Sequence, residues 1–148
     1  MIKLLFSLLL GLASIQDEGD TLYTMRGKPW NPDVKTTYMT MYYSPNSCHA
    51  CVNQLWQYIL DECSQAPDHQ PLLIVEGGDI LSMRNQTRYL HDTFGESVNI
   101  YYDNPPQGER KISDKYEIRY FPCLFIITNK TQFQYFSYAE LFRSSEKK

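Results

Sequence analysis

The sequence predicts an α/β layered domain, and three observations carry that prediction. After residue 35, short β-branched or apolar segments alternate with two amphipathic helical segments. Two further strand-like segments then follow one another directly before a closing helix, and Gly or Pro residues separate the segments. Such alternation is typical of adjacent parallel strands joined by right-handed crossovers. The 148 residues are enough for one domain of this kind with a substantial core.

The first predicted strand and helix place two cysteines at the start of a helix. Residues 36–43 are β-branched or aromatic and contain no breaker, which predicts a strand. The next four residues predict a turn, with Ser47 as the N-cap of the helix that follows. Apolar side chains then recur at steps of three and four up to Cys63. One face of this helix is therefore expected to be buried before Ala66-Pro67 ends it.

The rest of the chain continues the alternation. Asp79 is the predicted N-cap of a second long helix, and Gly95 follows its last turn. The expected elements are a buried strand over 71–76, a helix from 80 to about 94, a strand over 98–102, a short helix over 112–118, strands over 122–128 and 132–136, and a final helix from about 139. We expect residues 14–35 to form an irregular lead-in to a domain that comprises residues 36–148.

The first thirteen residues differ in character from the rest. Lys3 is followed by about ten apolar or small residues, which is the size of a signal-peptide core and too short to span a bilayer. Gly11 and Ala13 supply small residues for cleavage after Ala13. We therefore expect residues 1–13 to be a signal peptide and the protein to be exported, to the periplasm if it is bacterial and otherwise to the secretory lumen or the exterior. A buried first helix or an uncleaved membrane anchor is the open alternative.

The charge of the chain argues against nucleic acid as a partner. Lys and Arg total 14 and Asp and Glu total 17, so the formal net charge is −3, and no basic cluster occurs. Binding to phosphate groups requires a concentrated positive face.

Cys48 and Cys51 are the candidate catalytic residues. At a helix N-terminus the unpaired N–H groups and the helix dipole lower the pKa of a thiol, and the thiolate is the attacking species in disulfide exchange. His49, when protonated, would stabilise the same Cys48 thiolate. Cys51 lies one helical turn further on and suits the role of the resolving thiol. The expected chemistry is attack by Cys48 on a partner disulfide, followed by release of the mixed disulfide by Cys51.

Two other interpretations of the cysteine pair remain open at this stage. The pair could be a structural disulfide, which would suit a non-catalytic binding module. It could also be half of a metal site, although no second pair lies at ligand spacing. We expect neither a metal nor a bound cofactor. Cys63 is expected to be a buried free thiol packed in the helix face, and Cys123 a core residue at a strand start, with a third redox thiol as the alternative for Cys123. His69 and His91 are expected to be solvated.

Two segments resemble signatures of the thioredoxin superfamily. Residues 42–51, Tyr-Tyr-Ser-Pro-Asn-Ser-Cys-His-Ala-Cys, are similar to its active-site segment. Residues 112–122 are similar to its second signature, in which Pro122 would follow a cis peptide bond and face the active site. The strand and loop at 98–110 resemble the extra-strand insertion of the TlpA-type branch.

The resemblance implies a thioredoxin-like fold, with a central mixed sheet flanked by helices. It further implies a thiol–disulfide oxidoreductase that needs no bound cofactor. Its partners would be proteins that carry thiols or disulfides, together with an unidentified protein that recycles its redox state.

The chain also departs from the family pattern. Ser47 stands where many members have Trp, and His49-Ala50 replaces the commoner middle residues, so the resemblance does not say whether the protein oxidises, reduces or isomerises disulfides. The strand before the motif lacks the buried acid that many thioredoxins use to deprotonate the resolving thiol. Glu76, at the end of the next strand, is a candidate substitute, and a solvent-exposed glutamate at a strand end is the alternative.

Overall fold

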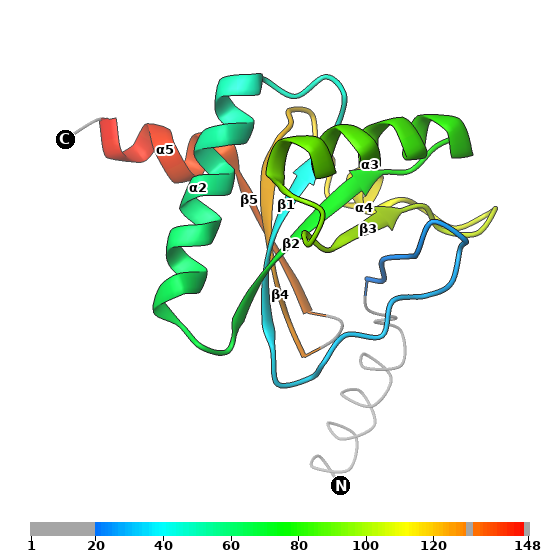
Figure 1. Cartoon of the computed structure of the whole chain (residues 1–148), viewed down its shortest axis with the longest axis horizontal. Coiled ribbons are helices and arrows are strands. Elements are labelled where there is room, and N and C mark those ends of the chain that lie inside the picture. The colour runs from blue at the N-terminus through cyan, green and yellow to red at the C-terminus, as the bar shows by residue number, and fades with distance from the viewer. Residues whose placement is uncertain (1–19, 130–131, 147–148) are drawn as a thin grey trace, which may run out of the picture.

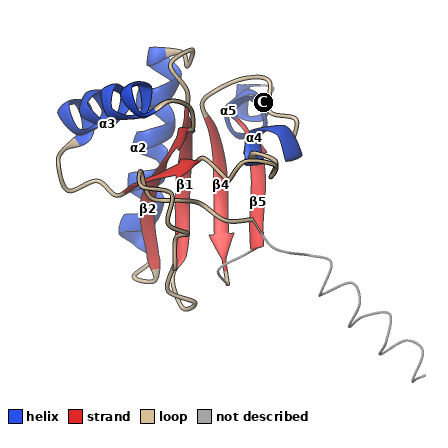
Figure 2. Ribbon diagram, turned by 90° about the vertical axis from the view of Figure 1, so that its right-hand side faces the viewer, coloured by secondary structure: helices blue, strands red, loops and turns tan. Residues whose placement is uncertain are grey.

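The computed structural model describes residues 20–129 and 132–146, so the predicted signal peptide over 1–13 lies outside the described part of the chain. A five-stranded mixed sheet has the strand order β3-β2-β1-β4-β5 (Figures 1 and 2). None of the helices in the described residues is both long and apolar enough to cross a membrane.

The predicted alternation of strands and helices is confirmed. Strand β1 (Thr37–Tyr43) is central and leads into helix α2 (His49–Gln65). Strand β2 (His69–Glu76) pairs with β1 in parallel, as the right-handed crossover predicts. Helix α3 (Ile80–Phe94) then leads to the short edge strand β3 (Ile100–Asp103), which pairs with β2 in parallel.

The second half of the sheet is antiparallel. The short helix α4 (Ile112–Lys115) leads to strand β4 (Cys123–Thr128), which pairs with the other side of β1. Strand β5 (Gln132–Ser137) pairs with β4, and helix α5 (Tyr138–Glu146) ends the described chain. Among the five described strands, β1 alone has a parallel neighbour on one side and an antiparallel neighbour on the other.

Both faces of the sheet are buried, since successive side chains of a strand point to opposite faces. Met39, Met41 and Tyr43 of β1 belong to a core under α2 and α3, whereas Tyr42 belongs to a second core under α4. Figure 2 shows α2 and α3 on one side of the sheet and α4 on the other. Helix α5 packs against α2, with the rings of Phe142 and Tyr58 5.9 Å apart.

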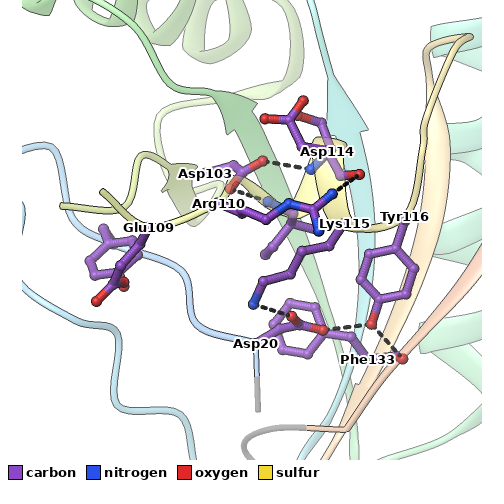
Figure 3. Close-up of polar contacts among 11 residues, drawn as sticks. Asp20, Asp103, Glu109, Arg110, Asp114, Lys115, Tyr116 and Phe133 are labelled. Atoms are coloured by element: carbon purple, nitrogen blue, oxygen red, sulfur yellow. Dashed lines mark hydrogen bonds and ion pairs between the residues drawn. The ribbon is translucent and has the colours of Figure 1, made fainter. Parts of the chain in front are cut away.

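The lead-in over residues 20–35 contains no helix or strand of its own, but it is not merely a linker. Leu22 is fully buried in the second core. Tyr23 forms an isolated bridge with Tyr102 of β3, in which Tyr23 N donates to Tyr102 O at 2.9 Å and Tyr102 N donates to Tyr23 O at 2.8 Å. Asp20 accepts bonds from Lys115 Nζ at 3.1 Å and from the Tyr116 hydroxyl at 2.5 Å (Figure 3). The lead-in is therefore fastened to the domain at both β3 and α4.

Two boundaries that bear on the site differ from the prediction. The short helix is only four residues long, because Glu117 adopts a positive φ of 52° and ends the helical path. Strand β2 starts two residues before Pro71, because its register with β1 pairs Thr37 with His69. His69, which the sequence predicts to be solvated, therefore lies in a strand and is half-buried, with its Nδ1 3.0 Å from Asp68 Oδ1.

Candidate active site

The turn after β1 places Cys48 at the start of α2. Ser47 N donates to Ser44 O at 2.9 Å, and Ser44 N donates to Ser47 Oγ at 3.1 Å, so the turn is closed by two reciprocal bonds. The Ser47 hydroxyl is thereby used inside the turn, and the prediction that it caps the helix is wrong by one residue. Cys48 is the N-cap, and its sulfur accepts from Cys51 N at 3.3 Å.

Cys48 and Cys51 form a disulfide whose Cα atoms are 5.1 Å apart. Cys48 is exposed, whereas Cys51 is half-buried on the first turn of the helix. When this bond is reduced, the Cys48 sulfur remains next to the free N–H groups of the helix, an environment that favours its thiolate. The pair therefore combines an accessible sulfur with a shielded one.

A groove runs along one side of this disulfide. It has a volume of about 480 Å³, and the residues that line it are Cys48, Cys51, Tyr120, Phe121, Pro122, Ser137, Tyr138 and Ala139. The Phe121–Pro122 peptide bond is cis, and Pro122 lies in the same groove as the cysteines, which confirms both parts of that prediction. Tyr120 is 84% exposed, so the groove has an aromatic residue open to a bound partner.

His49 reaches across the other side of the disulfide to helix α3. Its Nδ1 lies 3.2 Å from the Tyr89 hydroxyl, and the two rings are 6.3 Å apart. Tyr89 in turn stacks on Tyr43, with ring centroids 6.0 Å apart. The predicted action of His49 on the Cys48 thiolate stays a prediction. The structure adds that His49 contacts Tyr89, which lies 40 residues further along the chain.

Among the described residues, the buried acid is Asp103, which sequence reasoning missed. Asp103 is 1% exposed and accepts three hydrogen bonds: from the Tyr42 hydroxyl at 2.5 Å, from Ile112 N at 2.8 Å and from Ser113 N at 3.0 Å. Figure 3 shows it beside the start of α4. Burial in the core, and then the charge of Asp103, raise the pKa of Tyr42 far above its usual value.

Asp103 is connected in two ways to the segment that leads to Pro122 in the groove. The ring of Tyr42 lies 5.1 Å from that of Phe121, the residue before Pro122. The N–H bonds from residues 112 and 113 hold the start of the segment that leads to this proline. Glu76, the candidate acid predicted from the sequence, is half-buried at the end of β2 and is the register partner of Asp103. Its proposed role in deprotonation stays a prediction.

Cys63 and Cys123 are free, as expected. Burial raises the pKa of the Cys123 thiol far above its usual value, and Cys123 lies in the core at the start of β4. Cys63 is only half-buried; burial and then the charge of Glu62 raise the pKa of its thiol. His91, on α3, has Nε2 3.4 Å from Val98 O. Within residues 20–129 and 132–146, no three His, Cys, Asp or Glu side chains are grouped as metal ligands.

Comparison with known proteins establishes the fold. No protein-family model and no curated protein matches the chain. A thioredoxin-like protein from Aeropyrum pernix superposes with a TM-score of 0.61 at 10% identity, covering 96% of this chain and 97% of that one. The thioredoxin domain of a thiol-disulfide oxidoreductase from Bacteroides vulgatus gives 0.56 at 9% identity, covering 87% and 91%. A thiol-disulfide oxidoreductase from Bacteroides fragilis gives 0.54 at 11% identity, covering 87% and 96%. The fold is thioredoxin-like.

Proposed function

We propose that this protein is a thiol–disulfide oxidoreductase that exchanges disulfides with partner proteins through Cys48 and Cys51. The observation that carries the proposal is the pairing of an exposed and a half-buried cysteine at the start of α2, opposite a cis proline in an open groove. A thioredoxin-like fold supports the same proposal, although the fold alone does not determine the function.

The proposed reaction needs no group beyond the two cysteines and the partner. In the reduced protein, the Cys48 thiolate attacks one sulfur of a partner disulfide, and the other partner sulfur leaves as a thiolate. Cys51, after losing its proton, attacks Cys48 Sγ, so that the mixed disulfide breaks and the partner departs as a dithiol. The partner gains two electrons and the protein is oxidised to the Cys48–Cys51 disulfide. The reverse sequence oxidises a partner dithiol, and a second redox protein must restore the starting state.

Each proposed role follows from the position of the side chain. Cys48 is the nucleophile because it is exposed and takes the N-cap position. Cys51 resolves the intermediate because it is half-buried and next to Cys48, which limits its access to other proteins. Pro122 forms the facing wall of the groove, and His49 and Glu76 are proposed supporting residues.

We further propose that the protein is exported and that residues 1–13 form a cleaved signal peptide, followed by a lead-in over 14–35 and the domain over 36–148. The apolar run after Lys3 supports this proposal, as does a disulfide that an oxidising compartment would maintain. N-terminal sequencing of the exported protein tests it, with Ser14 expected as the first residue.

The reduction potential of the Cys48–Cys51 pair tests the proposed function. We would equilibrate the protein with thiol–disulfide buffers of known potential and follow the two thiols, with Cys63→Ser as the matched control for an uninvolved cysteine. An exchanging pair should titrate within the range of cellular redox partners, about −120 to −270 mV. A potential below about −300 mV together with no exchange would instead indicate a structural disulfide.

A further inference from the structure

A second cavity lies on the other side of the disulfide from the groove. It has a volume of about 450 Å³, and the residues that line it are Tyr43, Pro45, Asp79, Leu81, Ser82, Asn85, Gln86 and Tyr89. We name it the α3 pocket, since most of these residues belong to or precede that helix. The strand order places the groove on the β4 side of β1 and the α3 pocket on the β2 side. Cys48 follows β1 and therefore lies between them.

The exposed apolar side chains are most numerous on α3, the helix whose Tyr89 contacts His49. Among the described residues, six large hydrophobic side chains are exposed: Val34, Leu60, Ile80, Leu81, Tyr89 and Tyr120. Three of the six stand on α3, and a fourth, Tyr120, lines the groove. Leu81, in the wall of the α3 pocket, is 65% exposed. Exposed apolar surface that is concentrated in one region marks an interaction site.

Two connections join the α3 pocket to the sulfur of Cys48. Tyr89 forms one wall of the pocket, and its hydroxyl lies 3.2 Å from Nδ1 of His49, the neighbour of Cys48 in sequence. Pro45 forms another wall and precedes Cys48 by three residues, which limits the separation of their Cα atoms to about 11 Å. The pocket is therefore within reach of a group bonded to Cys48.

The mixed disulfide with Cys48 determines which part of a partner protein can cover the α3 pocket. A mixed disulfide with Cys48 fixes the partner's cysteine at the sulfur, and an extended chain advances about 3.3–3.6 Å per residue. A segment that lies in the groove on one side of this cysteine would continue over His49 and Tyr89 on the other. Residues two to four positions from the partner's cysteine then reach the pocket. Its walls of Tyr43, Pro45, Leu81 and Tyr89 suit an apolar or aromatic side chain.

We propose that the α3 pocket is a second recognition site for the partner protein, and that it binds an apolar or aromatic side chain two to four residues from the partner's reacting cysteine. This inference rests on the proposed function and adds the substrate class that the site prefers. Ser82 and Asn85, at the polar side of the pocket, would bond to the main chain of the same segment.

The test compares one variant, one control and three disulfides. Leu81→Gln removes the most exposed apolar wall with little risk to folding. Leu60→Gln makes the same substitution on α2, nine residues beyond Cys51, or about 14 Å along the helix. The substrates are a cystine-linked peptide with Leu at positions two to four on both sides of the cysteine, the same peptide with Glu at those positions, and hydroxyethyl disulfide. The measured quantity is the second-order rate constant for oxidation of the reduced protein.

The wild-type protein and Leu60→Gln should both favour the Leu peptide over the Glu peptide by about tenfold, as expected for an apolar group in a partly open site. Leu81→Gln should lose most of this preference and keep its rate with hydroxyethyl disulfide, which is too small to reach the pocket. An unchanged preference in Leu81→Gln, or no preference in the wild-type protein, would overturn the inference while leaving the proposed function intact. Failure of the wild-type protein to react with any of the three disulfides would overturn the proposed function itself.

Discussion

Tyr42 and Asp103 are joined inside the core by a 2.5 Å hydrogen bond from the tyrosine hydroxyl to Oδ2 of the carboxylate. Tyr42 is fully buried and Asp103 is 1% exposed, so neither group exchanges this bond for one with bulk water. The bond links the ends of β1 and β3, two strands that are separated by β2 in the sheet. A buried polar contact therefore connects two non-adjacent strands on the face of the sheet that α4 covers.

Tyr42→Phe should lower the free energy of unfolding by about 1–3 kcal/mol, because Asp103 loses one of its donors and stays buried. Urea denaturation followed by circular dichroism measures the change. Tyr102→Phe is the matched control: it also removes a tyrosine hydroxyl bond of 2.5 Å, but the partner, Thr87, retains its bond to Met83 O at 2.7 Å. An equal loss in the two variants would contradict the special role of Asp103.

Cys51→Ser should accumulate mixed disulfides between Cys48 and partner proteins, since the thiol that completes the exchange is absent. Non-reducing electrophoresis of the variant, expressed in its own cells, shows these adducts, and mass spectrometry identifies the joined cysteines. Cys48→Ser should trap none, and Cys63→Ser should behave as the wild-type protein does. If Cys48→Ser traps partners and Cys51→Ser does not, the two roles are reversed.

His49→Ala should raise the pKa of the Cys48 thiol in the reduced protein and make the protein a weaker oxidant. A protonated imidazole stabilises the neighbouring thiolate, and stabilising the thiolate stabilises the reduced form. The effect should fade at a pH where imidazole is neutral. Ultraviolet absorbance of the thiolate against pH compares the two proteins.

Tyr89→Phe serves as the control for His49→Ala, because it removes the 3.2 Å contact to Nδ1 and retains the imidazole. Superimposable titration curves for the wild-type protein and His49→Ala would leave the helix terminus as the sole local cause of thiolate stabilisation.

The oxidised protein should lose stability above about pH 8.5, the range in which a thiol ionises in the unfolded chain. Burial raises the pKa of Cys123 in the folded protein, so the unfolded state releases a proton that the folded state keeps. The unfolding free energy is then unaffected below that pH and falls by up to about 1.4 kcal/mol per pH unit above it.

Cys123→Ala should remove most of this alkaline fall in the unfolding free energy, which is ~2.303RT per proton and pH unit. Urea denaturation between about pH 7 and pH 10 measures it. Cys63→Ala should remove less, because Cys63 is only half-buried. A slope that survives in Cys123→Ala would show that other groups, such as the buried tyrosines, dominate the alkaline range.

Local patterns in the sequence predicted the features that depend on neighbouring residues. The steps of three and four after Cys51 predicted α2, and Asp79 caps α3 as expected, with Oδ1 accepting from Ser82 N at 2.9 Å. The resemblance of residues 112–122 to a known signature predicted the cis bond before Pro122. In each case the determining contacts lie within one turn or one short segment.

The sequence could not predict which of two polar side chains takes a given bond, nor contacts between distant segments. Choosing between Ser47 and Cys48 as N-cap depended on whether the Ser47 hydroxyl is already bonded to Ser44 N. Asp103 follows a predicted aromatic strand and precedes a proline-rich loop, so the sequence predicts an ordinary loop acid. Only the folded chain brings the start of α4 close enough to bond to it. In the structure Asp103 is the last residue of β3, one position beyond the end of the strand predicted over 98–102.

The bridge between Tyr23 and Tyr102 has a consequence for self-association. In β3 the outward-facing backbone groups belong to alternate residues, and the lead-in already occupies both of those on Tyr102. Within the described residues, β5 at the opposite edge pairs on one side only. Open-ended fibrils require every molecule to accept a strand at two edges. Because the lead-in covers β3 at Tyr102, a strand of a second molecule cannot pair along the whole of that edge, which disfavours open-ended growth.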